Sequence, residues 1–434
     1  MLLEFRTKNY KSFKNEMVFS MTPNPRQKGL DYSIQTEKIG TTNYSGLSSA
    51  VIYGPNASGK TNLIGAMDTM KAIVLRGNIK NSETITSPNP ASYLLELIPN
   101  CNEEASPTNF SISFIEQGMV FDYSFSIMLG VFMEKDYPRN VISESLYINK
   151  KKIFERDESL SVSFPNKIIG YLNSSVNKNL QVAIGIANNG LNSDELFLCN
   201  GFKSIFSKEI ASIILKWFDE KFIVIYRSDA IKVMRKFADP KENAIYVAKT
   251  LTDAAKEFGI TANALGYKAE EDNMVLYSLF EKKHLAVPAE AFESFGTIRF
   301  VNEFPLVIRA LLSGATLVMD EFDASIHPMA LMNIIGIFHN DDINKNHAQL
   351  IFNTHNPIFL NSSLFRRDEI KFVERDENTN TSIHYALSDF KTADGIRKGE
   401  DYMSNYFVSR YGAIKDVDFS PLLEEIIHRN GGMQ

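Results

Sequence analysis

The chain has 434 residues, of which 44% are hydrophobic and 23% are charged, and its formal net charge is −6. This composition is typical of a globular protein with a large apolar core, and the length is enough for two or three domains or one elaborated fold. The acidic balance excludes a strongly basic nucleic-acid-binding protein and leaves only a local basic patch open.

The predicted elements divide the chain into four segments. Apolar residues at helical spacing predict helices, and period-two alternation predicts antiparallel strands. In chain order, the segments are 1–165, with two strands around "NYKSF", a strand at "SAVIY", a loop, a helix and antiparallel hairpins; 166–290, a mostly helical insertion; 291–390, which returns to alternating helices and strands; and 391–434, a tail that packs on the core.

The expected location is the cytoplasm. The N-terminus lacks an apolar core of signal-peptide length, and no later stretch approaches the ~18 apolar residues that span a membrane. Cys101 and Cys199 lie far apart without metal-ligand spacing, which is typical of a reducing compartment without disulfides.

The stretch "GPNASGKT" fits the pattern G-x-x-x-x-G-K-[ST] with an apolar strand before it and a helix after it. In such a loop, backbone N–H groups and the helix N-terminus bind phosphates. Lys60 would reach the β- and γ-phosphates, and Thr61 would hold Mg²⁺. The residues predicted to contact ATP here are Gly54, Asn56, Ala57, Ser58, Gly59, Lys60, Thr61 and Asn62.

Two later strand ends carry candidate catalytic side chains. "ATLVMDEFDASIHP" ends a strand at Asp320, a candidate Mg²⁺ ligand, and at Glu321, which could polarise an attacking water. "QLIFNTHNP" ends the next strand at His355, which should face the same crevice and contact a γ-phosphate. His327 begins a helix, so we expect a structural role or a place at an interface for it.

The turn in "ESFGTIRF" has two interpretations. Ser294 and Thr297 are ordinary helix-capping residues, because hydroxyls accept hydrogen bonds from the first N–H groups of a helix. Alternatively, small residues at a helix N-terminus, with Gly296 between them, allow close approach of a phosphate.

Taken in order, these motifs resemble those of ABC-type ATPases of the SMC/RecF/OLD branch, in particular compact bacterial AAA-family ATP-binding proteins of abortive-infection systems. The similar stretches are "EFRTKNYKSF", the N-terminal strand pair; "GPNASGKT", Walker A; "ESFGTIRF", the signature; "LVMDEFDASIHP", Walker B and D-loop; "FNTHNP", the switch histidine; and "RYGAI" near the C-terminus.

This resemblance implies an α/β P-loop NTPase of ABC type, with a mixed sheet flanked by helices, an antiparallel β subdomain and a helical insertion. It also implies a head-to-tail dimer around ATP, with larger oligomers left open. Ser294, Gly296 and Thr297 of one subunit would close on the γ-phosphate bound by the other. Asp323 and Ser325 would communicate across the dimer.

The resemblance further implies the ATPase component of a bacterial anti-phage system that controls a separate toxin or nuclease. The chain has neither a long coiled coil nor a convincing nuclease motif after His355. A RecF/SMC-like DNA-repair or DNA-binding ATPase is the alternative, and a non-hydrolysing scaffold is a third. The Q-loop residue, Gln117 or Glu144, stays open, as does the role of 166–290. The cluster of Arg366 and Arg367 is compatible with contact to DNA or a partner, or with a solvated edge, which the pattern favours.

Overall fold

The structure is a computed structural model that describes the chain except for residues 81–94, 102–103, 133, 135–136, 175, 177–178, 227–244, 248, 258, 260–262, 271–272, 325, 377, 392–399, 416–417 and 432–434. Its strands are β1 (Leu2–Lys8), β2 (Met17–Ser20), β3 (Ile34–Ile39), β4 (Thr42–Leu47), β5 (Ser49–Tyr53), β6 (Thr108–Glu116), β7 (Met119–Met128), β8 (Asn140–Ile148), β9 (Lys151–Arg156), β10 (Leu160–Val162), β11 (Phe222–Ile225), β12 (Ile245–Val247), β13 (Ala264–Glu270), β14 (Asn273–Phe280), β15 (Leu285–Pro288), β16 (Thr316–Met319), β17 (Gln349–Asn353), β18 (Ile370–Arg375) and β19 (Ser382–Ala386).

The α-helices are α1 (Lys60–Arg76), α2 (Leu180–Asn189), α3 (Lys208–Lys216), α4 (Lys249–Glu257), α5 (Ala289–Phe292), α6 (Phe295–Ser313), α7 (Pro328–Phe338), α8 (Tyr402–Phe407) and α9 (Ser420–Gly431). Two π-helices are η4 (Leu198–Phe206) and η5 (Trp217–Lys221), and the 3-10 helices are η1 (Asp31–Ser33), η3 (Ile169–Tyr171), η7 (Glu281–Lys283), η8 (Pro357–Phe359) and η9 (Leu387–Asp389). Among the described residues, no helix combines the length and the apolar character needed to cross a bilayer.

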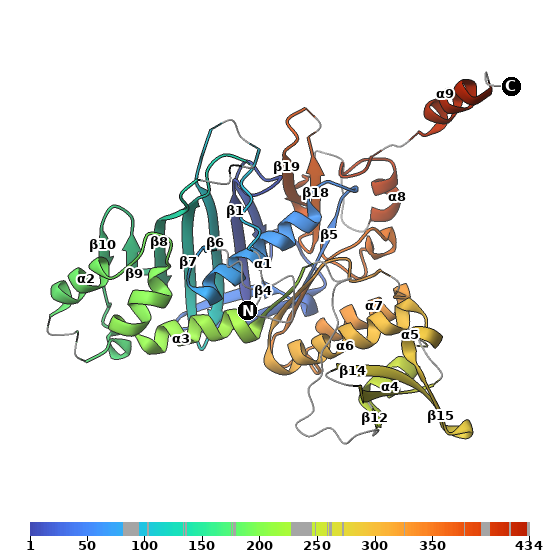
Figure 1. Ribbon diagram of the computed structural model, residues 1–434, viewed down its shortest axis with the longest axis horizontal. Helices are drawn as coiled ribbons and strands as arrows, with labels where there is room; N and C mark the ends of the chain where they lie inside the picture. Colours follow the sequence, from blue (N-terminus) through green and yellow to red (C-terminus); the bar gives the residue numbers. More distant parts are fainter. Residues whose placement is uncertain are drawn as a thin grey trace.

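A six-stranded mixed sheet with the order β11-β16-β17-β5-β18-β19 forms the centre of the fold (Figure 1). All neighbouring pairs are parallel except β18 and β19, which are antiparallel. Every residue of β5, β16 and β17 is buried, as expected for parallel strands covered on both faces. The carboxyl ends of these three strands therefore meet at one edge of the sheet.

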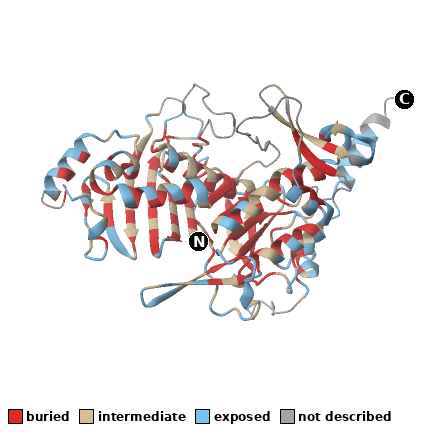
Figure 2. Cartoon of the chain, turned by 90° about the horizontal axis from the view of Figure 1, so that it is seen from below, coloured by how far each residue is buried: buried red, intermediate tan, exposed pale blue. Residues whose placement is uncertain are grey.

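A seven-stranded antiparallel sheet with the order β10-β9-β8-β7-β6-β1-β2 lies beside the mixed sheet. Its strands alternate between buried and partly exposed residues, because one face packs on helices and the other meets solvent. Side chains of α1 and α3 share one apolar cluster with the buried face, and Figure 2 shows the buried residues concentrated in the strands. The two sheets confirm the predicted fold class.

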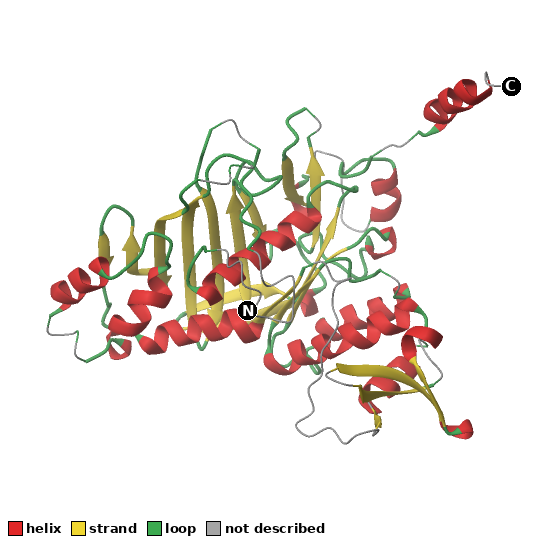
Figure 3. Cartoon of the chain, viewed as in Figure 1, coloured by secondary structure: helices red, strands yellow, loops and turns green. Residues whose placement is uncertain are grey.

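The expectation of a mostly helical segment at 166–290 is corrected by the structure. Helices occupy part of it, but β11 joins the mixed sheet and β12, β13, β14 and β15 form a separate four-stranded antiparallel sheet (Figure 3). The period-two runs in β13 and β14 pair directly, with Leu265 opposite Ser278. Alternation favours strands in these two runs, and their pairing with each other forms a sheet where the helical spacing of the preceding residues suggested more helix.

The C-terminal tail divides into two parts. Tyr402 and Tyr406 of α8, together with Tyr411, lie in an apolar cluster that also contains Val51 of β5 and Phe352 of β17. Helix α9, in contrast, extends away from the rest of the chain (Figure 1), and Leu423 and Ile427 are exposed. The expectation that the whole tail packs on the core is therefore corrected for α9, because its apolar face has no core residue against it among those described.

The Q-loop candidate Glu144 is wrong, because its side chain is a structural acceptor inside the fold. Its carboxylate is 1% exposed and accepts hydrogen bonds from the Tyr123 hydroxyl at 2.8 Å, the Phe197 N–H at 2.5 Å and the Leu198 N–H at 2.9 Å. Burial raises the pKa of Glu144, whereas these hydrogen bonds lower it. Gln117 lies exposed in the β6–β7 turn.

Replacing Glu144 by alanine should destabilise the protein by about 3 kcal/mol, because buried donors would lose their acceptor. Chemical denaturation monitored by circular dichroism would measure this loss. Glu155→Ala is the matched control, since within the described part of the chain the Glu155 carboxylate forms a surface ion pair with Lys152, and its loss should change stability by less than about 0.5 kcal/mol. Equal stability of the two variants would contradict the structural role of Glu144.

Candidate functional site

The phosphate loop connects β5 to α1 and depends on two glycines. Gly59 has a φ of 113°, and a Cβ atom there would lie 2.5 Å from the Ser382 hydroxyl oxygen. A Cβ atom on Gly54 would collide with the Val373 carbonyl oxygen. Larger residues would therefore displace the loop from the strands β18 and β19 that support it.

Lys60, the first residue of α1, places its ammonium inside the loop. The group donates hydrogen bonds to the carbonyl oxygens of Gly54 at 2.6 Å and Pro55 at 3.0 Å. Burial lowers the pKa of Lys60 to about 8, and the nearby carboxylates, Asp320 first, raise it. The loop thus holds a cation next to its own backbone N–H groups, which is the arrangement that binds a polyphosphate.

Thr61 and Asp320 bring the loop and the end of β16 together. The Thr61 hydroxyl donates to Asp320 Oδ1 at 3.2 Å, and the carboxylate is 4% exposed. Within the described residues, no three His, Cys, Asp or Glu side chains gather as a metal cage. One hydroxyl and one carboxylate suit Mg²⁺, which takes few protein ligands and completes its shell with water and phosphate. Among the described residues, the buried Ser58 hydroxyl has no hydrogen-bond partner, so it also fits a phosphate ligand.

Glu321 follows Asp320 in a turn with an unusual backbone. Its φ is 50°, a left-handed value that is uncommon for residues with a side chain. Its N–H donates to the side-chain oxygen of Asn353, and Asn353 donates to Asp320 Oδ1 at 2.5 Å. The exposed carboxylate of Glu321 can reach water, while the buried carboxylate of Asp320 is oriented by its neighbours.

The D-loop residue Asp323 contacts the segment that joins β17 to His355. Its Oδ2 accepts a hydrogen bond from the Thr354 hydroxyl at 2.6 Å. Burial raises the pKa of Asp323, and this hydrogen bond lowers it. Ser325, the other predicted D-loop residue, lies outside the described residues.

His355 lies close enough to the phosphate loop for their charges to interact. Burial lowers its pKa, the positive charge of Lys60 lowers it further, and the carboxylates of Asp323 and Glu321 oppose this effect. The imidazole is therefore neutral at neutral pH and can donate or accept a hydrogen bond. His327 instead caps α7, with Nδ1 3.2 Å from the Met329 N–H, which agrees with its expected structural role.

The turn at Ser294 caps α6 within its own chain. Its hydroxyl oxygen accepts a hydrogen bond from the Thr297 N–H at 3.1 Å and lies 2.9 Å from the Thr297 hydroxyl. Ser294 is exposed, and Phe295 beside it is 61% exposed. No hydrogen bond joins Ser294 to residues 54–62 in the described part of the chain, so the turn is open to another molecule.

Arg299, one turn further along α6, contacts the acidic turn directly. Its guanidinium donates to the Glu321 carbonyl oxygen at 2.6 Å and forms a buried ion pair with Glu303 at 2.8 Å. Burial raises the pKa of Glu303 to about 8, whereas the charge of Arg299 lowers it. The helix that begins at Ser294 is thereby connected to the backbone of the candidate water-activating residue.

The sequence interpretation missed the residues that support the site from a distance. In the sequence, the only indication of a role for Asn353 and Thr354 is that they directly precede His355. Ser12 accepts a hydrogen bond from Asn62 at 2.8 Å, although nothing in the "NYKSF" stretch alone places it beside the loop. Arg375, at the end of β18, donates to the Ala57 carbonyl oxygen at 3.3 Å.

The basic cluster just before β18 is buried, so its interpretations as a surface for DNA or a partner and as a solvated edge are wrong. Arg366 is 4% exposed, lies 2.9 Å from Asp368 and donates to the Gly29 carbonyl oxygen at 2.7 Å. Arg367 is buried and donates to the carbonyl oxygens of Leu387 and Phe390. Both guanidinium groups bind the fold itself, because buried charges require partners.

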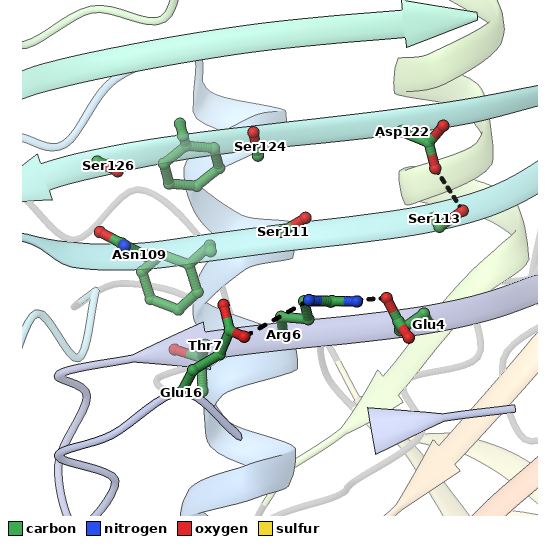
Figure 4. Close-up of a pocket in the computed structure, with 12 residues that line it drawn as sticks. Glu4, Arg6, Thr7, Glu16, Asn109, Ser111, Ser113, Asp122, Ser124 and Ser126 are labelled. Atoms are coloured by element: carbon green, nitrogen blue, oxygen red, sulfur yellow. Dashed lines mark hydrogen bonds and ion pairs between the residues drawn. The ribbon is translucent and has the colours of Figure 1, made fainter. Parts of the chain in front are cut away.

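A groove of about 380 Å³ lies on the solvent face of the seven-stranded sheet, apart from the phosphate loop (Figure 4). Serine hydroxyls of β6 and β7 line it together with the carboxylates of Glu4, Glu16 and Asp122. The single guanidinium, of Arg6, lies 2.6 Å from Glu4 and 3.5 Å from Glu16. The lining is therefore acidic, which disfavours contact of this groove with a nucleic-acid backbone.

A model of the family described as "AAA domain, putative AbiEii toxin, Type IV TA system" matches residues 49–361. No curated protein matches the chain. Similar solved structures include the SMC head domain from Thermotoga maritima, at 12% identity and a TM-score of 0.34, over 89% of this chain and 98% of that one. Another is an SmcHead bound to the C-winged helix domain of ScpA, at 14% identity and a TM-score of 0.38, over 91% and 99%. The family match spans the phosphate loop, the turn at Ser294 and His355.

The affinity for ADP should fall as the pH rises through about 8, because only the charged form of Lys60 pairs with phosphate. The expected decrease is at most about tenfold for each further pH unit. Titration with a fluorescent ADP analogue between about pH 6.5 and 9.5 measures it. Lys60→Arg keeps its charge over this range and should remove the pH dependence. A flat profile for the unchanged protein would contradict the assignment.

Proposed function

This chain belongs to the AAA domain family whose model matches residues 49–361, and we propose that it is an ABC-type ATPase that binds and hydrolyses ATP and dimerises around it. The contact between Thr61 and Asp320, at 3.2 Å, carries the proposal. It joins the phosphate loop to the acidic strand end, and this pair is suited to a divalent cation bound together with nucleotide phosphates.

Each residue of the site has a role that its geometry supports. Lys60 and the loop N–H groups bind the β- and γ-phosphates, and Thr61 and Asp320 hold Mg²⁺. When bound, Mg²⁺ neutralises negative charge on the phosphates. Glu321 orients the attacking water and accepts its proton, and His355 hydrogen-bonds the γ-phosphate.

The exposed turn at Ser294 supports a head-to-tail dimer. Ser294, Gly296 and Thr297 begin α6, and the N-terminus of a helix of this length favours a negatively charged ligand. Among the described residues, no hydrogen bond joins Ser294 to residues 54–62, and Ser294 is exposed, so its partner would be the γ-phosphate held by a second copy. Capping of the helix and contact in trans are compatible, because the capping bonds use only part of the turn.

The proposed biological role is control of a separate toxin or nuclease in bacterial anti-phage defence. The family description, which names a toxin of a toxin–antitoxin system, supports a place in such systems. Dimer formation and dissociation would then hold or release the effector. The observed Arg299 contact supports coupling between the α6 turn and Glu321.

Glu321→Gln should bind ATP without hydrolysing it and therefore accumulate the dimer. Light scattering with Mg-ATP should show the mass rising from one chain of 49.0 kDa to two, and phosphate release should fall by at least about 100-fold. Ser294→Arg in the same background should abolish the mass increase while leaving ATP binding to each monomer intact. A monomer in every condition would refute the trans contact, and unchanged phosphate release would refute the role of Glu321.

A DNA-binding ATPase is the alternative function. The salt dependence of the affinity for DNA distinguishes it from the proposed anti-phage ATPase. Contact with several phosphates would make the affinity for duplex DNA fall steeply between about 50 and 200 mM salt. Since Arg366 and Arg367 are buried in internal contacts, we expect no retention of DNA even at the lower concentration. Fluorescence anisotropy with a labelled duplex, with and without ATP, makes the measurement. Tight binding that weakens steeply with salt would favour the alternative.

A further inference from the structure

Asn353 occupies the point where the two acidic residues meet. It ends β17, its side chain is buried at 1% exposure, and β17 pairs in parallel with β16, with Phe352 opposite Met319. The residues that follow this pair, Asp320 and Asn353, therefore lie side by side at the carboxyl edge of the sheet. A side chain there can contact both Asp320 and the turn that follows it.

The side-chain amide of Asn353 donates one hydrogen bond and accepts another, and the two bonds go to different residues. Its N–H group donates to Asp320 Oδ1 at 2.5 Å, and its oxygen accepts the backbone N–H of Glu321. Asp320 Oδ1 also accepts the Thr61 hydroxyl at 3.2 Å. Asn353 thus fixes the orientation of the carboxylate and, at the same time, the peptide unit between Asp320 and Glu321.

The second bond bears on Glu321, whose backbone is in the left-handed region at a φ of 50°. Residues with a Cβ atom rarely keep this conformation unless their surroundings hold it. Here Asn353 holds the N–H, and Arg299 holds the carbonyl oxygen at 2.6 Å. The same carbonyl oxygen also accepts the Ala324 N–H at 3.0 Å, so loss of the Asn353 contact at the Glu321 N–H would loosen the turn and redirect the Glu321 carboxylate.

We propose that Asn353 is a positioning residue that sets the Mg²⁺ ligand Asp320 and the water-activating Glu321 with one side chain. The asparagine amide carries both a donor and an acceptor on one short side chain. A carboxylate at the same place would set a second negative charge against Asp320. The proposal deepens the proposed ATPase function and rests on it, because Asn353 acts on nucleotide only through these two neighbours.

The test compares Asn353→Ala and Asn353→Leu with the unchanged protein. Leucine fills the buried space without either hydrogen bond, so it separates lost polar contacts from a cavity. Asn344→Leu is the matched control, because Asn344 is also buried and bonds the backbone at Phe338 and Ala348, before β17 and away from the loop. Binding of a fluorescent ADP analogue is titrated with Mg²⁺ and repeated in EDTA, kcat and KM for ATP are measured, and thermal melting reports folding.

Both Asn353 variants should need about 10- to 100-fold more Mg²⁺ for half-maximal enhancement of ADP binding, as is usual when a residue supporting a metal ligand is removed. Their affinity in EDTA should stay within about threefold, and the loss in hydrolysis should appear in kcat more than in KM. Asn344→Leu should lower the melting temperature without moving the Mg²⁺ midpoint.

Three results would overturn the inference. An unchanged Mg²⁺ midpoint in folded Asn353→Leu refutes the positioning role alone, provided that the unchanged protein shows Mg²⁺-dependent ADP binding. A failure of both Asn353 variants to fold would assign the residue to stability instead. Absence of Mg²⁺-dependent nucleotide binding in the unchanged protein would refute the proposed function, and the positioning role with it.

Discussion

The parallel pairing of β16, β17 and β5 is the constraint on which the site depends. Asn353 lies opposite Ile52, and Phe352 lies opposite Met319, so the residues after each strand emerge at the same level. A shift of one residue in either pairing would turn the side chains to the other face of the sheet. The phosphate loop, the acidic pair and His355 come from three separate parts of the chain, and this register brings them together.

Burial then sets the electrostatics of the site. Lys60 is buried at the start of α1 and loses part of its affinity for its proton, while Asp323 holds its proton more strongly than a solvated carboxyl would. His355 is kept neutral by burial and by the charge of Lys60. Charged groups in such a place need a counter-charge, and a bound polyphosphate with a divalent cation supplies both signs.

The site also extends beyond the strand ends through α6. Ser294 begins this helix at the surface, and Arg299, five residues later, reaches the Glu321 carbonyl oxygen. A force on the exposed turn would therefore be transmitted by a rigid element to the acidic turn. Glu321 has a left-handed backbone that Arg299 contacts at its carbonyl oxygen and Asn353 contacts at its N–H. A movement of α6 would therefore change the conformation of this residue first.

The family and the fold class could be predicted from the amino-acid sequence, because their evidence lies in contiguous residues. Gly54–Thr61 forms its loop locally, so its spacing and its flanking strand and helix were enough, and the match over residues 49–361 confirms the predicted abortive-infection type of ATP-binding protein. The order of the acidic pair and the histidine was likewise readable from two apolar strands. The trans contact of Ser294 stays a proposal, since the sequence implies it only by resemblance.

The residues that support these motifs could be identified only from the three-dimensional fold. Asn353 bonds Asp320 across 33 positions, Arg299 bonds Glu321 across 22, and Glu144 bonds Phe197 across 53. The four-stranded sheet within 166–290 and the burial of Arg366 were equally hidden. A hydrogen bond between distant residues leaves no period in the sequence, because it depends on where the packed strands and helices place two backbones, which local propensity does not encode.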